Sequence, residues 1–217
     1  MGPRRLAAFQ SRSKGRYGGS MVVKARTLLL FALLGATVAS ATTLLSLDLP
    51  ALTKGSTVIA RGTVRSVEAR WTKDGGRIMT DAVLEVTEPW KGAPSKQITV
   101  MQPGGVVGEV GQIVHGTVRF TVGEDVVVFL EPRGDHFLLT GMLQGKFKVE
   151  TSSDGKAVFA RQELESEALL VDAATHQPVQ ATAVVLPLEK LRAQVLALAG
   201  ATAPTQPTSP GPVKVTP

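Results

Sequence analysis

The sequence contains no cysteine among its 217 residues. This absence excludes a disulfide framework, a thiolate metal site and a lipid anchor on an N-terminal cysteine. A folded domain in this chain must therefore be held together by its hydrophobic core, and a stretch of about 160 ordered residues is long enough to form one.

Histidine is also scarce, and the motifs of common enzyme classes are missing. The three histidines, His115, His136 and His176, fall in separate segments. The chain has no His-Glu-x-x-His, no Gly-x-Ser-x-Gly and no glycine-rich phosphate loop leading into a helix. We therefore predict no catalytic residue, no metal and no cofactor, and a protein that is not an enzyme. A hydrolase with a dispersed site is kept as an alternative.

Acidic residues are absent from residues 1–41, which hold seven of the chain's 24 lysines and arginines. From Thr42 onward, 17 basic residues therefore face 18 acidic ones. A domain with this balance lacks the basic surface that binds a phosphate backbone. The net charge of +6 thus does not indicate a nucleic-acid partner, and we predict none.

Residues 1–41 have the features of a leader that ends in a secretory signal peptide. Residues 21–26 form a short positive region, residues 27–38 are apolar, and small residues up to Ala41 are typical of a signal-peptidase site. We predict translation from Met21, cleavage after Ala41, and a secreted or periplasmic protein without stable membrane insertion. An uncleaved anchor is the alternative, because residues 27–47 carry no charge and are long enough to span a bilayer.

Residues 42–200 are expected to form a single domain made mainly of β-strands. The predicted strands are residues 57–70, 77–87, 96–102, 118–121, 125–131, 136–140, 145–150 and 156–160. Within 77–87, apolar residues alternate with polar ones, which predicts a half-buried antiparallel strand. Asp81 and Glu85 then lie on its exposed face rather than in a catalytic pair. Gly62, inside the first strand, predicts a bulge or a bend.

Two helices are expected to frame these strands. A short one covers residues 46–53, with Ser46 as its cap. A stronger one starts at Pro187 and ends at Gly200, and its apolar stripe is Leu188, Leu191, Val195 and Leu198. Residues 201–217 contain five prolines and four threonines, so we predict a disordered tail.

Two tryptophans and a glycine-rich stretch supply the candidate binding site. The candidate residues are Trp71, Trp90, Gln102, Gly104, Gly105 and Glu109. Each tryptophan lies beside a predicted turn, where it either caps the barrel or presents a binding surface. Long loops on a rigid scaffold are where binding function concentrates. We therefore expect the partner at residues 102–111, with a plain connector as the alternative.

Three segments carry a family resemblance: Ser56–Arg65, Val83–Gly92 and Val122–Leu130. In this order they resemble the netrin-like domain of the tissue inhibitors of metalloproteinases, which has an OB-type barrel. The chain also resembles uncharacterised secreted bacterial domains that share a Lys-Gly pair, a Gln-Pro-Gly-Gly run and the Gln144–Phe147 segment. The resemblance covers residues 56–149 and implies a closed or partly open, antiparallel OB-like (netrin-like) barrel.

The resemblance also implies inhibition of a metalloprotease. Members of the inhibitor family place the amine and first carbonyl of an N-terminal cysteine on the catalytic zinc, and a disulfide holds that end. Here the predicted mature N-terminus is Thr42-Thr43, and no disulfide can hold it. We therefore favour a non-catalytic exported module that binds a protein, peptide or glycan through its barrel loops, and keep the inhibitor as the alternative.

Overall fold

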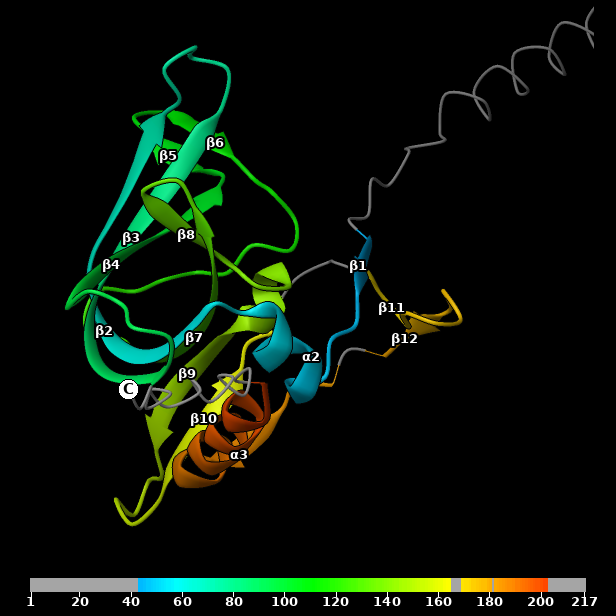
Figure 1. Ribbon diagram of the computed structural model, residues 1–217. Coiled ribbons are helices and arrows are strands. Elements are labelled where there is room, and N and C mark those ends of the chain that lie inside the picture. The colour runs from blue at the N-terminus through cyan, green and yellow to red at the C-terminus, as the bar shows by residue number, and fades with distance from the viewer. Residues whose placement is uncertain (1–42, 165–168, 181, 203–217) are drawn as a thin grey trace, which may run out of the picture. The chain divides into compact units, whose positions relative to one another are not determined.

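The computed structural model describes residues 43–164, 169–180 and 182–202. The predicted leader, its cleavage site, Thr42 and residues 203–217 of the predicted tail lie outside these described residues. The described part is mainly β, as predicted (Figure 1). Its elements are β1 (Thr43–Leu45), α2 (Leu49–Gly55), β2 (Val58–Trp71), β3 (Ile78–Lys91), β4 (Gln97–Pro103), β5 (Gly105–Val107), β6 (Val110–Gln112), β7 (Asp125–Arg133), β8 (His136–Leu139), a 3-10 helix (Met142–Gly145), β9 (Lys146–Thr151), β10 (Val158–Gln162), β11 (Leu169–Val171), β12 (Pro178–Val179), β13 (Val185–Pro187) and α3 (Leu188–Thr202).

Five strands of the largest sheet follow one another in a partly closed ring. Their order is β7, β2, β3, β4 and β8, and β8 pairs again with β7. Neighbouring strands in the ring are antiparallel except for β4 and β8, which run parallel and share the single pair Val100 and Phe137. Strands β9, β10 and β13 continue the same sheet outward from β7.

Strand β7 explains how the sheet holds two cores. Its residues Val126 to Leu130 are all fully buried. Alternate side chains point to opposite faces of a strand, so Val126 and Val128 join the core inside the ring while Val127 and Phe129 join a second core under the helices. A strand covered on both faces needs this continuous apolar run.

Strand β3 shows the alternation predicted from its sequence. Ile78, Thr80, Ala82 and Leu84 are buried, and Asp81 and Glu85 lie on the other face. The irregularity predicted at Gly62 is also present, because the register between β2 and β3 shifts there. A Cβ on Gly62 would lie 2.6 Å from the Glu85 carbonyl oxygen, so only glycine fits this close approach.

Both helices are present among the described residues, with ends that differ from the expected ones. Helix α2 begins at Leu49 because the Asp48 carboxylate, and not Ser46, caps it by accepting a hydrogen bond from the Ala51 N–H at 2.8 Å. Helix α3 continues through Gly200 to Thr202. Alanines flank Gly200, and one helical glycine costs only about 1 kcal/mol.

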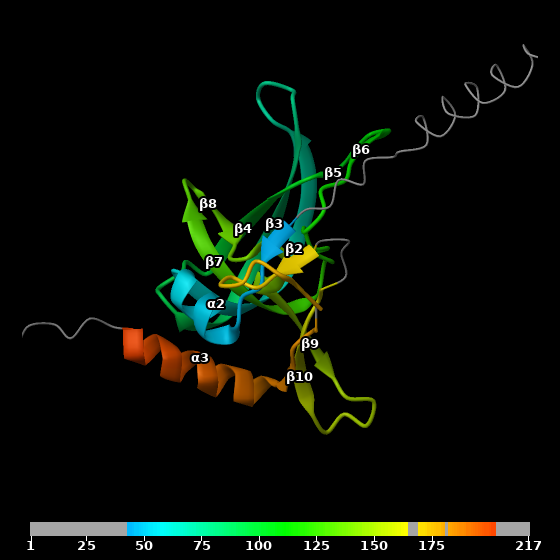
Figure 2. The same ribbon diagram turned by 90° about the vertical axis from the view of Figure 1, so that its right-hand side faces the viewer.

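The helices cover the second core. Leu188, Leu191 and Val195 of α3 are buried against Phe129, and Leu52 of α2 joins them. The two helices lie side by side in both views (Figures 1 and 2). Within the described residues, neither helix is long and apolar enough to cross a membrane.

Several short strands were not predicted, and one predicted strand is wrong. Residues 118–121 form no strand. The glycine-rich stretch, expected as a loop, forms the hairpin of β5 and β6. Strand β1 pairs in parallel with β11, which pairs with β12, in a separate small sheet. Strands of two or three residues carry too little periodicity to be recognised.

Candidate binding groove

Hydrogen bonds from β3 anchor the β5–β6 hairpin at both of its ends. The Gly104 N–H donates to the Ile78 carbonyl at 2.8 Å, and the Thr80 hydroxyl donates to the Gly104 carbonyl at 2.7 Å. At the other end of the hairpin, the Ile78 N–H donates to Oε1 of Gln112 at 2.7 Å. The hairpin is therefore fixed to the ring and is not a free loop.

Glycine allows the hairpin to approach the ring this closely. Gly105 has φ of +131°, a backbone conformation that side chains disfavour. A Cβ there would lie 2.4 Å from the Thr80 hydroxyl oxygen and 2.9 Å from the Ala69 Cβ. Glycine at this position thus allows the hairpin backbone to lie in close contact with the sheet.

The chain from Ile113 to Thr121, which we call the crossing segment, follows the hairpin and is held by a side chain. Gln102 donates from Nε2 to the Val118 carbonyl at 2.6 Å and accepts from the Val118 N–H at Oε1 over 3.3 Å. Its amide therefore satisfies backbone groups that a neighbouring strand would otherwise bond. At Val118, the amide of Gln102 thus takes the place of a paired strand.

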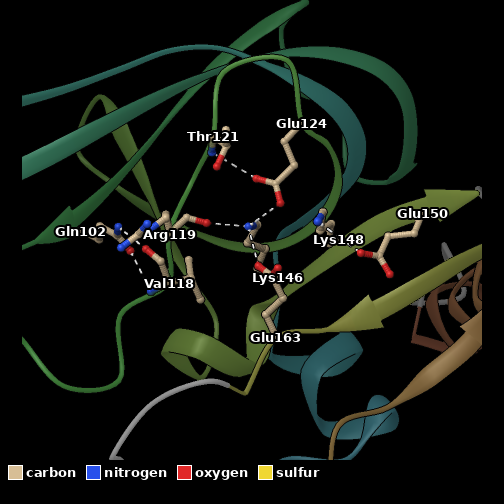
Figure 3. A network of polar contacts seen from close by, with 9 residues as sticks. All are labelled: Gln102, Val118, Arg119, Thr121, Glu124, Lys146, Lys148, Glu150 and Glu163. Carbon is tan, nitrogen blue, oxygen red and sulfur yellow. Dashed lines mark hydrogen bonds and ion pairs between the residues drawn. The ribbon is translucent and has the colours of Figure 1, made fainter.

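The ammonium group of Lys146 lies at the centre of a buried network (Figure 3). The residue is fully buried, and Nζ donates to the Arg119 carbonyl at 2.6 Å, to Glu124 Oε1 at 2.9 Å and to Glu163 Oε2 at 2.8 Å. The Phe120 ring centre lies 5.1 Å from Nζ. An ammonium group has three donors, so Lys146 has none left for a ligand.

A cavity of about 970 Å³ lies between the hairpin, the crossing segment and the ring. We call it the hairpin groove. It is lined by residues 102–106, 111–114 and 117–121, together with Val67, Thr80, Glu124, Lys148 and Glu163. A second cavity of about 570 Å³ shares Lys148 and Glu163 with it. Ligand pockets commonly measure roughly 300–1,000 Å³.

Exposed aliphatic side chains lie on the hairpin side of the groove. Ile113 is 86% exposed and Val106 is 67% exposed, and both line the groove. Val110 is 50% exposed, but it pairs with Val107 and so lies on the other face of the hairpin, outside the groove. Aliphatic side chains grouped in this way on a soluble surface are typical of a contact site for another molecule.

Most charges beside the groove are paired. Hydrogen bonds from Arg161 and Lys148 lower the pKa of Glu150. The same contact with Glu150 raises the pKa of Lys148. Arg119 is exposed, and its guanidinium forms no ion pair or hydrogen bond with any residue in the described ranges. Within the part of the chain that the structure describes, it is the charged side chain of the groove that lacks such a partner.

The residues predicted for binding are only partly brought together. Gln102, Gly104 and Gly105 line the groove, where they serve as supports. Glu109 lies at the exposed tip between β5 and β6 and does not line it. Trp71 is exposed at the end of β2, outside the groove.

Trp90 lies in the second core, near the end of β3, whereas Trp71 pairs with Ile78 at the start of that strand. It is 4% exposed and therefore presents no binding surface. Burial raises the pKa of the neighbouring Glu88, but the Arg192 guanidinium, which donates to its carboxylate, and the nearby charge of Arg61 outweigh this effect and lower it. Trp90 and Glu88 together tie β3 to helix α3.

The predicted inhibitory segment is described from Thr43 onward, while Thr42 lies outside the described residues. Thr43 is exposed on β1. The chain after it is clamped by Gln144, which donates to the Leu45 carbonyl at 2.8 Å and accepts from the Leu47 N–H at 2.8 Å. Leu44 and Leu47 pack against the two cores.

The acidic residues considered for catalysis have structural partners. Asp81 pairs with Arg70, and Glu85 pairs with Arg65, in each case between β2 and β3. Among the described residues, no group of three or more His, Asp or Glu side chains could hold a metal ion.

Sequence reasoning missed Lys146 and Arg119. Strand β9 alternates, so the buried Phe147 places Lys146 on the opposite face, toward the ring side of β7. That alternation is the signal that could have found Lys146. Arg119 has no such signal, because it lies in a segment without regular structure.

No protein-family model matches the sequence, and no curated protein matches it significantly.

Proposed function

We propose that this protein is an exported, non-catalytic binding module that holds a peptide segment of a partner protein in the hairpin groove. The observation that carries the proposal is the pair of exposed aliphatic side chains, Val106 and Ile113, that line an anchored groove. Exposed apolar side chains beside a preformed cavity favour binding, because a ligand that covers them removes apolar surface from water.

A peptide fits this groove better than a glycan does. A glycan needs many hydrogen-bonding partners, but three polar side chains of the groove are already bonded to the backbone. Both ends of the Gln102 amide bond Val118, Oε1 of Gln112 bonds Ile78, and the Thr80 hydroxyl bonds Gly104. What remains for the ligand is aliphatic surface together with the Arg119 guanidinium.

The scaffold is proposed to be an OB-type barrel of the netrin-like kind. OB barrels have five strands and are partly open. The ring of β7, β2, β3, β4 and β8, thinly joined between β4 and β8, supports this assignment. Such barrels host many unrelated functions, so the groove and not the fold carries the functional argument.

The charged network beside the groove favours a binding role over catalysis. All three Lys146 donors are occupied, and the Glu124 carboxylate also accepts from the Thr121 N–H at 3.2 Å. A catalytic lysine or carboxylate needs a free position that faces the substrate. Here the ammonium group is bonded to both carboxylates, and the network fixes the backbone of the groove.

The test is selection of peptides from a phage-displayed dodecapeptide library on protein purified after expression of the full chain. We expect enriched peptides whose synthetic versions bind, with affinity falling at least tenfold in Ile113→Ser. The matched control is Val158→Ser, which removes an exposed valine outside the groove. Equal binding to both variants would overturn the proposal. So would a library that yields no binder while a glycan array gives a signal.

A second candidate is metalloprotease inhibition through the mature N-terminus. The observation that favours it is the Gln144 clamp, which orders the chain after Thr43 without a disulfide. The amine of Thr42 would occupy the open fourth position of a catalytic zinc. Adding one alanine before Thr42 should abolish inhibition of co-exported metalloproteases. Equal inhibition by the extended protein would exclude the amine as the ligand.

Export is proposed from the leader and is tested separately. Mass spectrometry of the secreted and periplasmic fractions should find an N-terminus at Thr42. A membrane-bound chain that retains Met21 would contradict cleavage and favour the anchor.

A further inference from the structure

The charge distribution around the hairpin groove indicates what the ligand carries. Lys146 pairs with Glu124 and Glu163, and Glu150 pairs with Lys148 and Arg161. Arg119 alone lines the groove without a charged partner among the described residues. The groove therefore presents one uncompensated positive charge beside an aliphatic rim.

The backbone of Arg119 is held on both sides. The preceding residue, Val118, is bonded at its N–H and its carbonyl by Gln102. The Arg119 carbonyl accepts from the buried Lys146 ammonium at 2.6 Å (Figure 3). Backbone that is fixed before binding loses less entropy when a ligand arrives. The buried lysine thus fixes the backbone from which the exposed Arg119 side chain extends.

We propose that Arg119 binds a carboxylate of the peptide, so that the groove selects segments in which Asp or Glu lies beside an aliphatic residue. This inference rests on the proposed function. A guanidinium matches the geometry of a carboxylate and binds it through two parallel hydrogen bonds. The aliphatic neighbour of that carboxylate covers Val106 and Ile113.

A carboxylate suits this site better than a phosphate group. A phosphorylated side chain carries about −1.5 to −2 charges at neutral pH. Arg119 supplies one positive charge, and the Glu163 carboxylate lies on the same groove. A singly charged group is therefore balanced by Arg119, whereas a phosphate would keep negative charge beside Glu163.

The experiment compares four fluorescent pools of capped heptapeptides on protein purified after expression of the full chain. The central residue is Asp, Asn, Lys or phosphoserine, and the flanking positions are random mixtures of Val, Ile, Leu, Ser and Gly. We expect the Asp pool to bind at least tenfold more tightly than the Asn pool. Arg119→Gln should remove this difference, and raised salt should reduce it.

The control is Arg133→Gln, which removes one exposed positive charge on β7 outside the groove and should leave the Asp preference unchanged. Equal binding of the Asp and Asn pools, with Ile113→Ser weakening both, would overturn the role of Arg119 and leave the peptide groove in place. Tightest binding of the phosphoserine pool would overturn the carboxylate. No binding of any pool would defeat the proposed function itself.

Discussion

The side-chain amide of Gln102 bonds the backbone of Val118 through both of its ends, with Nε2 to the carbonyl at 2.6 Å and Oε1 from the N–H at 3.3 Å. One glutamine thereby replaces the strand that would otherwise flank this segment. Gln102 holds the crossing chain at Val118, while Lys146 and Glu124 hold it at Arg119 and Thr121.

Gln102→Glu should destabilise the protein by about 1–3 kcal/mol. The carboxylate keeps the shape of the amide but cannot donate to the carbonyl of the buried Val118, which is left without its partner. Urea unfolding of both proteins measures the difference. Gln97→Glu, an exposed position on the same strand, is the control and should be near neutral. Equal losses in the two variants would contradict the clamp.

Lys146→Met should cost roughly 3–5 kcal/mol of unfolding free energy, because it leaves two carboxylates together without their cation. Adding Glu124→Gln and Glu163→Gln should recover much of this loss. Lys148→Met, in the exposed pair with Glu150, should cost less than about 1 kcal/mol. If the triple variant is no more stable than Lys146→Met, uncompensated charge is not the cause.

Gly105→Ala should detach the hairpin from the ring. The added methyl group meets Thr80 and Ala69 at distances below 3 Å, and the residue has positive φ. We expect a lower thermal midpoint and weaker peptide binding. Gly111→Ala is the matched control, because its Cβ would meet only a Val106 methyl group at 3.7 Å. An unchanged Gly105→Ala protein would mean that the hairpin moves freely.

Glu88 should make stability depend on pH. Its pKa is lowered in the folded protein, so it contributes stability above its ordinary pKa, and this contribution is lost as the pH falls through the lowered value. Glu88→Gln should therefore be less stable than the native protein at pH 6, and the gap should narrow toward pH 3. Thermal unfolding across this range measures it. Glu131→Gln, an exposed carboxylate, controls for the general effect of acid.

Leu84→Ala should cost roughly 2–5 kcal/mol by opening a cavity inside the ring. Val122→Ala shortens an aliphatic side chain that is exposed, and it should change stability little. Chemical denaturation compares the two variants. Similar small losses in both would place Leu84 outside the core.

The strand content and the faces of the long strands could be predicted because their periodicity is strong. Leu84 and its neighbours on β3 alternate clearly, and Gly62 marks an irregularity where only glycine fits. Helix ends were less predictable. Asp48 and Ser46 are both competent caps, and the choice between them depends on how Leu49 and Leu52 reach the second core.

The groove could be located from composition but not explained by it. Glycine and glutamine at Gly104, Gly105 and Gln102 indicated an unusual segment, yet their roles depend on contacts with β3 and Val118 across the sheet. The ion-paired residues Lys146 and Glu163 are 17 positions apart along the chain. Such long-range pairing leaves no local pattern in a sequence.

The ring closes between β4 and β8 through one in-register pair, Val100 and Phe137, whereas every other junction of the ring has at least four. Local unfolding starts where the fewest backbone hydrogen bonds must break. Thermal fluctuations should therefore separate β4 from β8 first. Gln102 lies two residues beyond Val100 and carries the crossing segment with it. The groove can therefore widen by separation of β4 from β8 while the long β2–β3 ladder remains intact.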